Sequence, residues 1–156
     1  MGTIIMAPSP AALHQLKVSL IENNTSYNGA DVTGNWVVFR QQAVSAAQAE
    51  YNKLTVVAHV ETISTAGGGL TAQTYARVQV AGTQVGQLVT GGVATNGLGS
   101  QSYVGNCLIV TLVAGVDYTR GTGFNLDFAQ RGVVSNPVGT TCTAYLLGYN
   151  IEGVSD

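Results

Sequence analysis

Charge is what this sequence has least of. Asp, Glu, Lys and Arg make up 9% of its 156 residues, against roughly a quarter in an average soluble domain. The six basic residues are scattered and the formal net charge is −2, so no basic arm or stripe is available to bind nucleic acid. A cytosolic monomer usually carries more charge to stay soluble. The low charge therefore favours a protein that packs against copies of itself or against another subunit, and predicts no nucleic-acid partner.

A membrane-spanning run and a secretion signal are also missing. Residues 107–114 hold one polar side chain, Thr111, but these eight residues fall far short of the ~20 that a spanning helix needs. The first residues, MGTIIMAPSPAAL, have neither the basic start nor the long apolar core of a secretion signal. We therefore expect no membrane partner.

Cysteine is scarce as well. Cys107 and Cys142 lie 35 positions apart, without the paired spacing of a zinc site, and only His14 and His59 could add ligands. Free cysteines are among the most buried residue types, so we expect two buried thiols, with one disulfide between them as the alternative. No cofactor is predicted.

Short segments rich in Val, Ile, Thr and Tyr dominate what is present. Apolar and polar residues alternate within them, which predicts strands. About eight such strands are separated by loops rich in Gly, Asn, Ser and Thr, among them 91–101 and 131–141. The pattern predicts an all-β fold, an antiparallel β-sandwich of jelly-roll type. We expect one domain over 15–156, preceded by an N-terminal arm over 1–14.

Local patterns refine this prediction. The segment 41–53, QQAVSAAQAEYNK, has apolar residues at helical spacing and predicts at most one short helix, with an irregular strand pair as the alternative. The glycines at 67–69 predict the turn of a hairpin between 54–63 and 73–80. Alternation places the following residues of the last strand on one face: Thr143, Tyr145, Leu147, Tyr149 and Ile151.

Two of the predicted strands, 36–39 and 107–113, are apolar on both faces. A strand in a two-layer sandwich turns only one face to the core, so the other face needs a cover from a loop, the short helix or another chain. The low charge and the apolar start of the arm favour another chain. Tyr is also common at interfaces. The candidate assembly residues are Ile4, Ile5, Met6, Tyr75 and Tyr103.

The arm MGTIIMAPSP, the Thr-, Gly- and Val-rich segment TAQTYARVQVAGTQVGQLVTGG and the near-absence of charge together resemble the small virion proteins of tailed bacteriophages, especially head decoration (cement) proteins. The resemblance implies a homotrimer on the outer surface of the head, which binds the major capsid protein or another virion protein and stabilises the shell. It also implies a location in the virion and assembly in the host cytoplasm. The alternatives are a phage fibre or receptor-binding module of lectin type, and a capsid protein with a single jelly roll.

Few residues suggest catalysis. His59 and Glu61 would share one face of a strand and could begin a metal or acid–base site, but the sequence offers no obvious third ligand. Asp117 and Asp127 flank a turn and could form a glycosidase-like pair, although dispersed carboxylates are usually solvated or cap loops. We therefore predict no catalytic, cofactor-binding or metal residues, and a protein that is not an enzyme.

Overall fold

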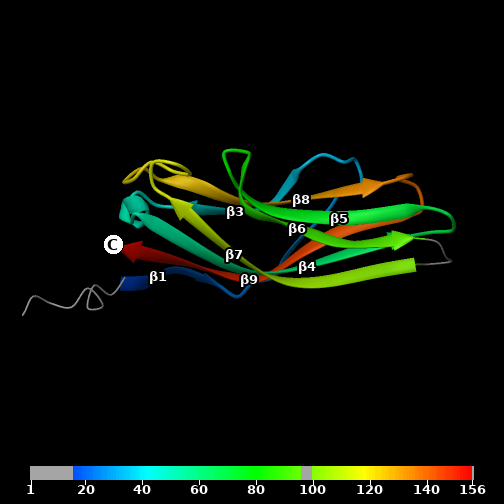
Figure 1. The fold of residues 1–156 in the computed structure, drawn as a ribbon, viewed down its shortest axis with the longest axis horizontal. Helices are drawn as coiled ribbons and strands as arrows, with labels where there is room; N and C mark the ends of the chain where they lie inside the picture. The colour runs from blue at the N-terminus through cyan, green and yellow to red at the C-terminus, as the bar shows by residue number, and fades with distance from the viewer. Residues whose placement is uncertain (1–15, 96–99, 156) are drawn as a thin grey trace, which may run out of the picture.

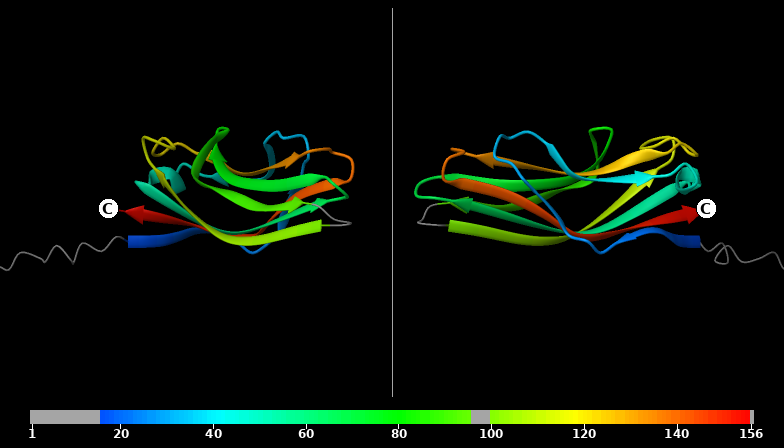
Figure 2. Two further views of the ribbon diagram at one scale, coloured as in Figure 1. Left: turned by 45° about the vertical axis from the view of Figure 1, so that its right-hand side comes forward. Right: turned by 180° about the vertical axis from the view of Figure 1, so that it is seen from behind.

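The computed structural model describes residues 16–95 and 100–155. These residues form nine β-strands and one 3-10 turn, η2 (Gln48–Glu50). The strands make two antiparallel sheets that lie over one another as layers (Figures 1 and 2). The all-β sandwich predicted from alternation is confirmed.

The two sheets are named here after a central strand of each. The β4 sheet has the order β1-β9-β4-β7, and β2 also pairs with β9. Its strands are β1 (Leu16–Asn23), β2 (Tyr27–Ala30), β4 (Lys53–Ala66), β7 (Ser100–Val113) and β9 (Thr140–Ser155). The β5 sheet has the order β3-β8-β5-β6. Its strands are β3 (Val37–Val44), β5 (Thr71–Val80), β6 (Thr83–Thr95) and β8 (Phe124–Val134).

The strand pairs are nested along the chain. β5 pairs with β6, and this pair is enclosed in turn by the pairs β4–β7, β3–β8 and β1–β9. Such nesting is what a long antiparallel ribbon gives when it is rolled into two facing sheets, which is the jelly-roll arrangement. The outermost pair brings the two ends of the described chain together, since Leu16 is the strand partner of Ser155.

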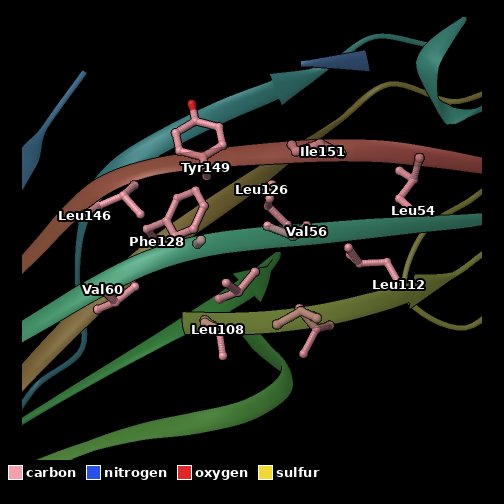
Figure 3. Packing of buried hydrophobic residues seen from close by; sticks show 14 of the residues in the cluster. Leu54, Val56, Val60, Leu108, Leu112, Leu126, Phe128, Leu146, Tyr149 and Ile151 are labelled. Carbon is pink, nitrogen blue, oxygen red and sulfur yellow. The ribbon is translucent and has the colours of Figure 1, made fainter. Parts of the chain in front are cut away.

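The core lies between the layers and follows the predicted alternation of β4. Its inward side chains are at most 2% exposed: Leu54, Val56, Ala58 and Val60. Across the layers, the ring of Phe128 from β8 packs against that of Tyr149 from β9, with centroids 4.9 Å apart (Figure 3). One apolar face per strand is therefore enough to fill the space between the sheets.

One end of the core is built from small residues. Ala66, Ala72 and Ala94 form a separate buried cluster with Cys142. The buried hydroxyl oxygens of Ser64 and Thr74 lie 2.8 Å apart beside this cluster, so polar atoms there find partners within the protein.

A helix does not span 41–53, and the irregular strand pair, the alternative prediction for this stretch, is the closer description. The limit of at most one short helix is confirmed. Residues 41–44 continue β3, where Gln41 is the partner of Asp127 and Val44 that of Phe124. Only η2 is helical in this stretch. A helix of this length is marginal on its own in water, whereas pairing with β8 satisfies a row of backbone groups and leaves Val44 only 2% exposed.

The loops predicted at 91–101 and 131–141 are shorter than expected. β6 continues to Thr95, β8 continues to Val134, and β7 begins at Ser100. Gly91 lies inside β6, where a Cβ atom would come within 2.6 Å of Thr62 Oγ1. This glycine allows close approach of β6 to β4 and does not mark a turn.

The glycines at 67–69 do not close a hairpin. β4 and β5 belong to different sheets, because β7 and β9 already occupy both edges of β4. The turn is a corner between the layers, and the N–H of Gly67 donates to the carbonyl of Gly139 over 2.8 Å.

The face predicted for the last strand is wrong in its first half. In β9, Tyr149 and Ile151 point into the core, but Thr143, Tyr145 and Leu147 point outward. The register between β4 and β9 shifts between His59 and Val60, whose partners are Gly148 and Leu146. Leu147 is thus the extra residue of a β-bulge, which reverses the alternation on either side of it.

Candidate assembly face

The outward side of the β4 sheet carries large apolar side chains that no described segment covers. On the edge strand β7, the exposed fractions are 56% for Tyr103, 63% for Ile109 and 36% for Val113. Leu147, at the bulge of β9, is 39% exposed. The β7 face, as we call it, consists of Val57, Ile63, Tyr103, Cys107, Ile109, Val113 and Leu147.

The alternation of β7 produces this face. Leu108, Val110 and Leu112 point into the core and are at most 6% exposed, so the intervening residues must point outward. The prediction that 107–113 is apolar on both faces is therefore correct. Its outer side is open to solvent in the single chain.

Cross-strand neighbours place apolar side chains side by side at two points of the face. Val57 of β4 is the direct partner of Ile109, and Ile63 is the partner of Tyr103. Such directly opposed side chains touch across antiparallel strands. Apolar groups therefore meet across two strands at each of these points, as exposed apolar groups do on interaction surfaces. The pairs His59–Cys107 and Glu61–Gly105 lie between the two points.

Polar side chains lie among the apolar ones, including His59 and Glu61 of β4 and Thr111 of β7. Glu61 of β4 accepts a hydrogen bond from the Tyr103 phenol, and this bond is the main reason that the pKa of Tyr103 is raised.

The face is hollowed beside its protruding side chains. One open hollow of about 450 Å³ lies against His59 and Leu147 and is bordered by Glu22 and Asn24. A second, of about 250 Å³, shares His59 and Leu147 and reaches Cys107. Protrusions such as Ile109 next to hollows give the relief that two interlocking subunits require.

The backbone of β7 is also available for pairing. Within the described chain, β7 ends the order of the β4 sheet, so its outer row of N–H and C=O groups has no neighbouring strand in that sheet. A long edge strand with apolar side chains is a template for another chain. Both the edge and the face of β7 can therefore contact a partner.

The second doubly apolar strand is only partly open. Val37 and Val38 are 40% and 42% exposed. Phe39 is partly covered by β2, where a Cβ atom at Gly29 would come within 2.5 Å of its side chain. This strand belongs to the β5 sheet and does not extend the β7 face.

The structure separates the residues predicted for assembly. Tyr103 lies on the β7 face, but Tyr75 lies on the outward side of the β5 sheet, where its hydroxyl donates to Gln73 Oε1 over 2.6 Å. Ile4, Ile5 and Met6 lie outside the described residues. A role of all five in assembly stays a prediction.

Sequence reasoning did not select Ile109, Val113 and Leu147. A signal for Ile109 and Val113 was present, because both alternate with the three core residues of β7. No comparable signal existed for Leu147, because its outward position depends on the bulge.

The two cysteines behave differently. Both are free, Cys142 is buried as predicted, and Cys107 is exposed. The prediction of a buried Cys107 is wrong because inward and outward side chains alternate along β7 and Cys107 is one of those that point outward. Burial raises the pKa of the Cys142 thiol, which lowers its reactivity relative to an ordinary thiol.

The residues weighed for chemistry have local structural roles or stand alone. Asp127 Oδ1 accepts from Gln41 Nε2 over 2.9 Å, and Asp117 Oδ2 accepts from the N–H of Val113 over 2.8 Å. Over residues 16–95 and 100–155, no group of three possible metal ligands comes together around His59 or elsewhere. The same residues contain no helix long and apolar enough to cross a membrane.

Comparison with known proteins assigns neither a family nor a role to this chain. No protein-family model matches the sequence, and no curated protein matches it. Among solved structures, infectious bursal disease virus strain Gx is similar with a TM-score of 0.30 and 10% identity, over 99% of this chain and 44% of that one. The VP2 subviral particle of the same virus gives a TM-score of 0.29 and 12% identity, over 97% of this chain and 45% of that one. This chain thus spans less than half of either, and the jelly-roll assignment rests on its own strand order.

Proposed function

We propose that this chain is a structural virion protein that works by packing its β7 face against other subunits. The observation that carries the proposal is the uncovered apolar surface of β7, with Ile109 63% exposed. The fold agrees with it, because jelly rolls recur in viral capsid proteins as well as in lectin domains. A β7 face with exposed apolar side chains, on a chain with 9% charged residues, suits permanent assembly.

The energetics favour covering this face. Taking one large aliphatic side chain out of water contributes roughly 1.5–3 kcal/mol before the costs of association. Glu61 and Lys53 lie beside these side chains on β4, and desolvation of their charges offsets part of that gain. A subunit that buries Ile109, Val113 and Leu147 together gains several such contributions.

The more specific proposal is a trimeric decoration protein on the outer surface of a phage head. Its support is the resemblance of the sequence to head decoration proteins, together with the exposed apolar side chains of β7, which a closed symmetric assembly would bury. In this proposal the segment 1–14 is an arm that engages the shell or an adjacent subunit.

Sedimentation of the purified chain, followed by its binding to expanded and unexpanded capsid shells, tests the proposal. We expect a trimer that binds the expanded shell. A stable monomer without affinity for either shell would overturn it.

Deletion of residues 2–8 tests the arm separately. We expect weaker shell attachment or trimerisation while the circular dichroism of the β-sandwich is unchanged. Attachment equal to that of the full chain would exclude a role for the arm.

A shell subunit with a single jelly roll is the second candidate. The nested strand pairs favour it, because β1–β9 to β5–β6 form one complete roll. Electron microscopy of the chain expressed alone separates the two candidates. Closed particles would indicate a shell subunit, and isolated trimers a decoration protein.

A further inference from the structure

A cluster of arginine and aromatic side chains lies on the outward side of the β5 sheet. The guanidinium carbon of Arg77 is 4.1 Å from the ring centroid of Trp36. That of Arg131 is 5.0 Å from Trp36 and 5.1 Å from the ring of Tyr75. We call these four residues the arginine cluster.

Strand register brings the cluster together. Arg131 of β8 is the direct partner of Tyr75 of β5. Arg77 of β5 is the partner of Ala129, which lies two residues before Arg131 on β8. Trp36 immediately precedes β3, whose first residue, Val37, is the partner of Gln130. Tyr75 and Arg77 come from β5, Arg131 comes from β8, and Trp36 lies just before β3. All four side chains project from the outward side of the β5 sheet.

The positive charge of the cluster has no acidic partner in the described chain. Among residues 16–95 and 100–155, neither Arg77 nor Arg131 forms an ion pair with a carboxylate. An ion pair elsewhere in this part of the chain joins Arg120 and Glu50. Partial burial, followed by the nearby charge of Arg131, lowers the pKa of Arg77. Two like charges are thus held close together against the aromatic rings that stabilise them, and an anion beside them would reduce their repulsion.

One guanidinium also has unused donor capacity. The buried Nε of Arg131 has no hydrogen-bond acceptor among the described residues. By contrast, Arg77 donates from Nε to Gln79 Oε1 over 2.9 Å and from Nη2 to the carbonyl of Gly82 over 3.1 Å. Arg77 is therefore held in place, whereas the side chain of Arg131 donates no hydrogen bond to the described residues. Because the Nε atom of Arg131 is covered by protein, its terminal nitrogens are the donors that a ligand could reach.

The side chain of Gln73 holds the ring of Tyr75 in place. Gln73 accepts the hydroxyl proton of Tyr75 and donates its own amide to the carbonyl of Gly91 over 2.8 Å. Side chains already locked by such bonds lose little freedom when a ligand arrives.

We infer that the arginine cluster binds an oxyanionic group, either a carboxylate or a sulfate or phosphate ester. Guanidinium groups donate paired N–H bonds to such oxygens, and these charge-assisted bonds are stronger than neutral ones. An oxyanion beside Arg131 would accept hydrogen bonds from its terminal nitrogens and relieve the repulsion from Arg77. The cluster lies on the opposite sheet from the β7 face, so its occupancy does not depend on the proposed function.

Trp36 gives a direct readout because it is the one tryptophan in the sequence. Its fluorescence is titrated with sodium acetate, sodium sulfate and sodium phosphate, each against sodium chloride at equal ionic strength. We expect a saturable change with at least one oxyanion and none with chloride. A stronger response to acetate identifies a carboxylate ligand, and a stronger response to sulfate or phosphate identifies an ester.

Substitutions make the test decisive. We expect Arg131→Gln to weaken the response about tenfold or more, the loss expected for a charge-assisted hydrogen bond, and Arg131→Lys to have an intermediate effect because it keeps the charge. Arg120→Gln, in an exposed ion pair elsewhere, is the matched control and should change nothing. If Arg131→Gln does not fold, Arg131→Lys decides. Equal responses to chloride, or unchanged titrations of the Arg131 variants, would overturn the inference.

Discussion

The two outward surfaces of the sandwich differ in chemistry although they enclose the same core. The β7 face presents Ile109, Val113 and Leu147 with few charges, whereas the outward side of the β5 sheet holds Arg77 and Arg131 against Trp36. Apolar contact is non-directional and depends on buried area, while a guanidinium pair recognises a particular kind of group. One surface is therefore suited to packing against subunits, and the other to selecting a ligand.

The comparison also shows what the core fixes. In both sheets the inward residues are mostly apolar, so the outward residues are free to vary without loss of fold. β7 uses that freedom for Ile109, and β5 uses it for Tyr75 and Arg77. Changes in the core should therefore disable both surfaces, and changes on one surface should spare the other.

The largest effect is expected for Phe128→Ala. Phe128 is 2% exposed and packs on Tyr149, so its truncation should lower the free energy of unfolding by about 3–5 kcal/mol. Urea denaturation followed by circular dichroism measures this change. Assembly and oxyanion binding should weaken together. A loss below about 1 kcal/mol would contradict the packing, and Ile109→Ala, which should cost no more than about 0.5 kcal/mol, is the surface control.

The second largest effect is expected in the rates at which the two thiols react with a thiol reagent. In the free subunit, Cys107 should react with a thiol reagent at least about 100-fold faster than Cys142, because the buried thiol must wait for the structure to open. Peptide mapping by mass spectrometry gives both rates in the unmodified sequence. In the assembled state Cys107 should become protected. Reaction of Cys107 at its free-subunit rate in the assembly would show that the β7 face is not the interface.

A smaller effect is expected from a charge placed on each surface. Ile109→Lys should raise the dissociation constant of the assembly at least about tenfold, or 1.4 kcal/mol, because a buried lysine must be desolvated. Val133→Lys puts the same change on the β5 sheet at a site that is 47% exposed and should leave assembly intact. Analytical ultracentrifugation distinguishes them. If Val133→Lys weakened assembly and Ile109→Lys did not, the interface would lie on the β5 sheet.

The smallest effect concerns salt. Raising sodium chloride from about 0.05 to about 0.5 M screens exposed charges, so it should weaken oxyanion binding at the arginine cluster severalfold. Self-association through the neutral β7 face should change by less than about twofold. Sedimentation and Trp36 fluorescence at the same salt concentrations give both numbers. Assembly that weakens as steeply as anion binding would mean that charge, not apolar area, holds the subunits together.

Local alternation carried most of the fold prediction. The inward set from Leu54 to Val60 and the doubly apolar 107–113 follow from a period of two residues, which the sequence displays directly. Low charge likewise pointed to assembly before any surface was known. These features depend on near neighbours in the chain, so sequence reasoning can reach them.

Long-range pairing decided the rest. Residues 41–44 follow their partner β8 instead of their helical spacing, and Leu147 points outward because β9 and β4 differ by one residue in register. The arginine cluster depends on the same kind of information, since Arg131 meets Tyr75 only through the pairing of β8 with β5. Alternation reveals which residues share a face of one strand, but not which strands are neighbours.

The pairing of Leu16 with Ser155 has a practical consequence. Anything fused before β1 or after β9 leaves from the same pole of the roll, and the corner at 67–69 lies at the other pole, where Ala66 partners Ser100 and Thr140. A short linker would therefore join the ends of the roll, and the chain could be reopened at that distant corner. Such a circular permutant would display cargo from the opposite pole and leave both outward sheet surfaces unaltered.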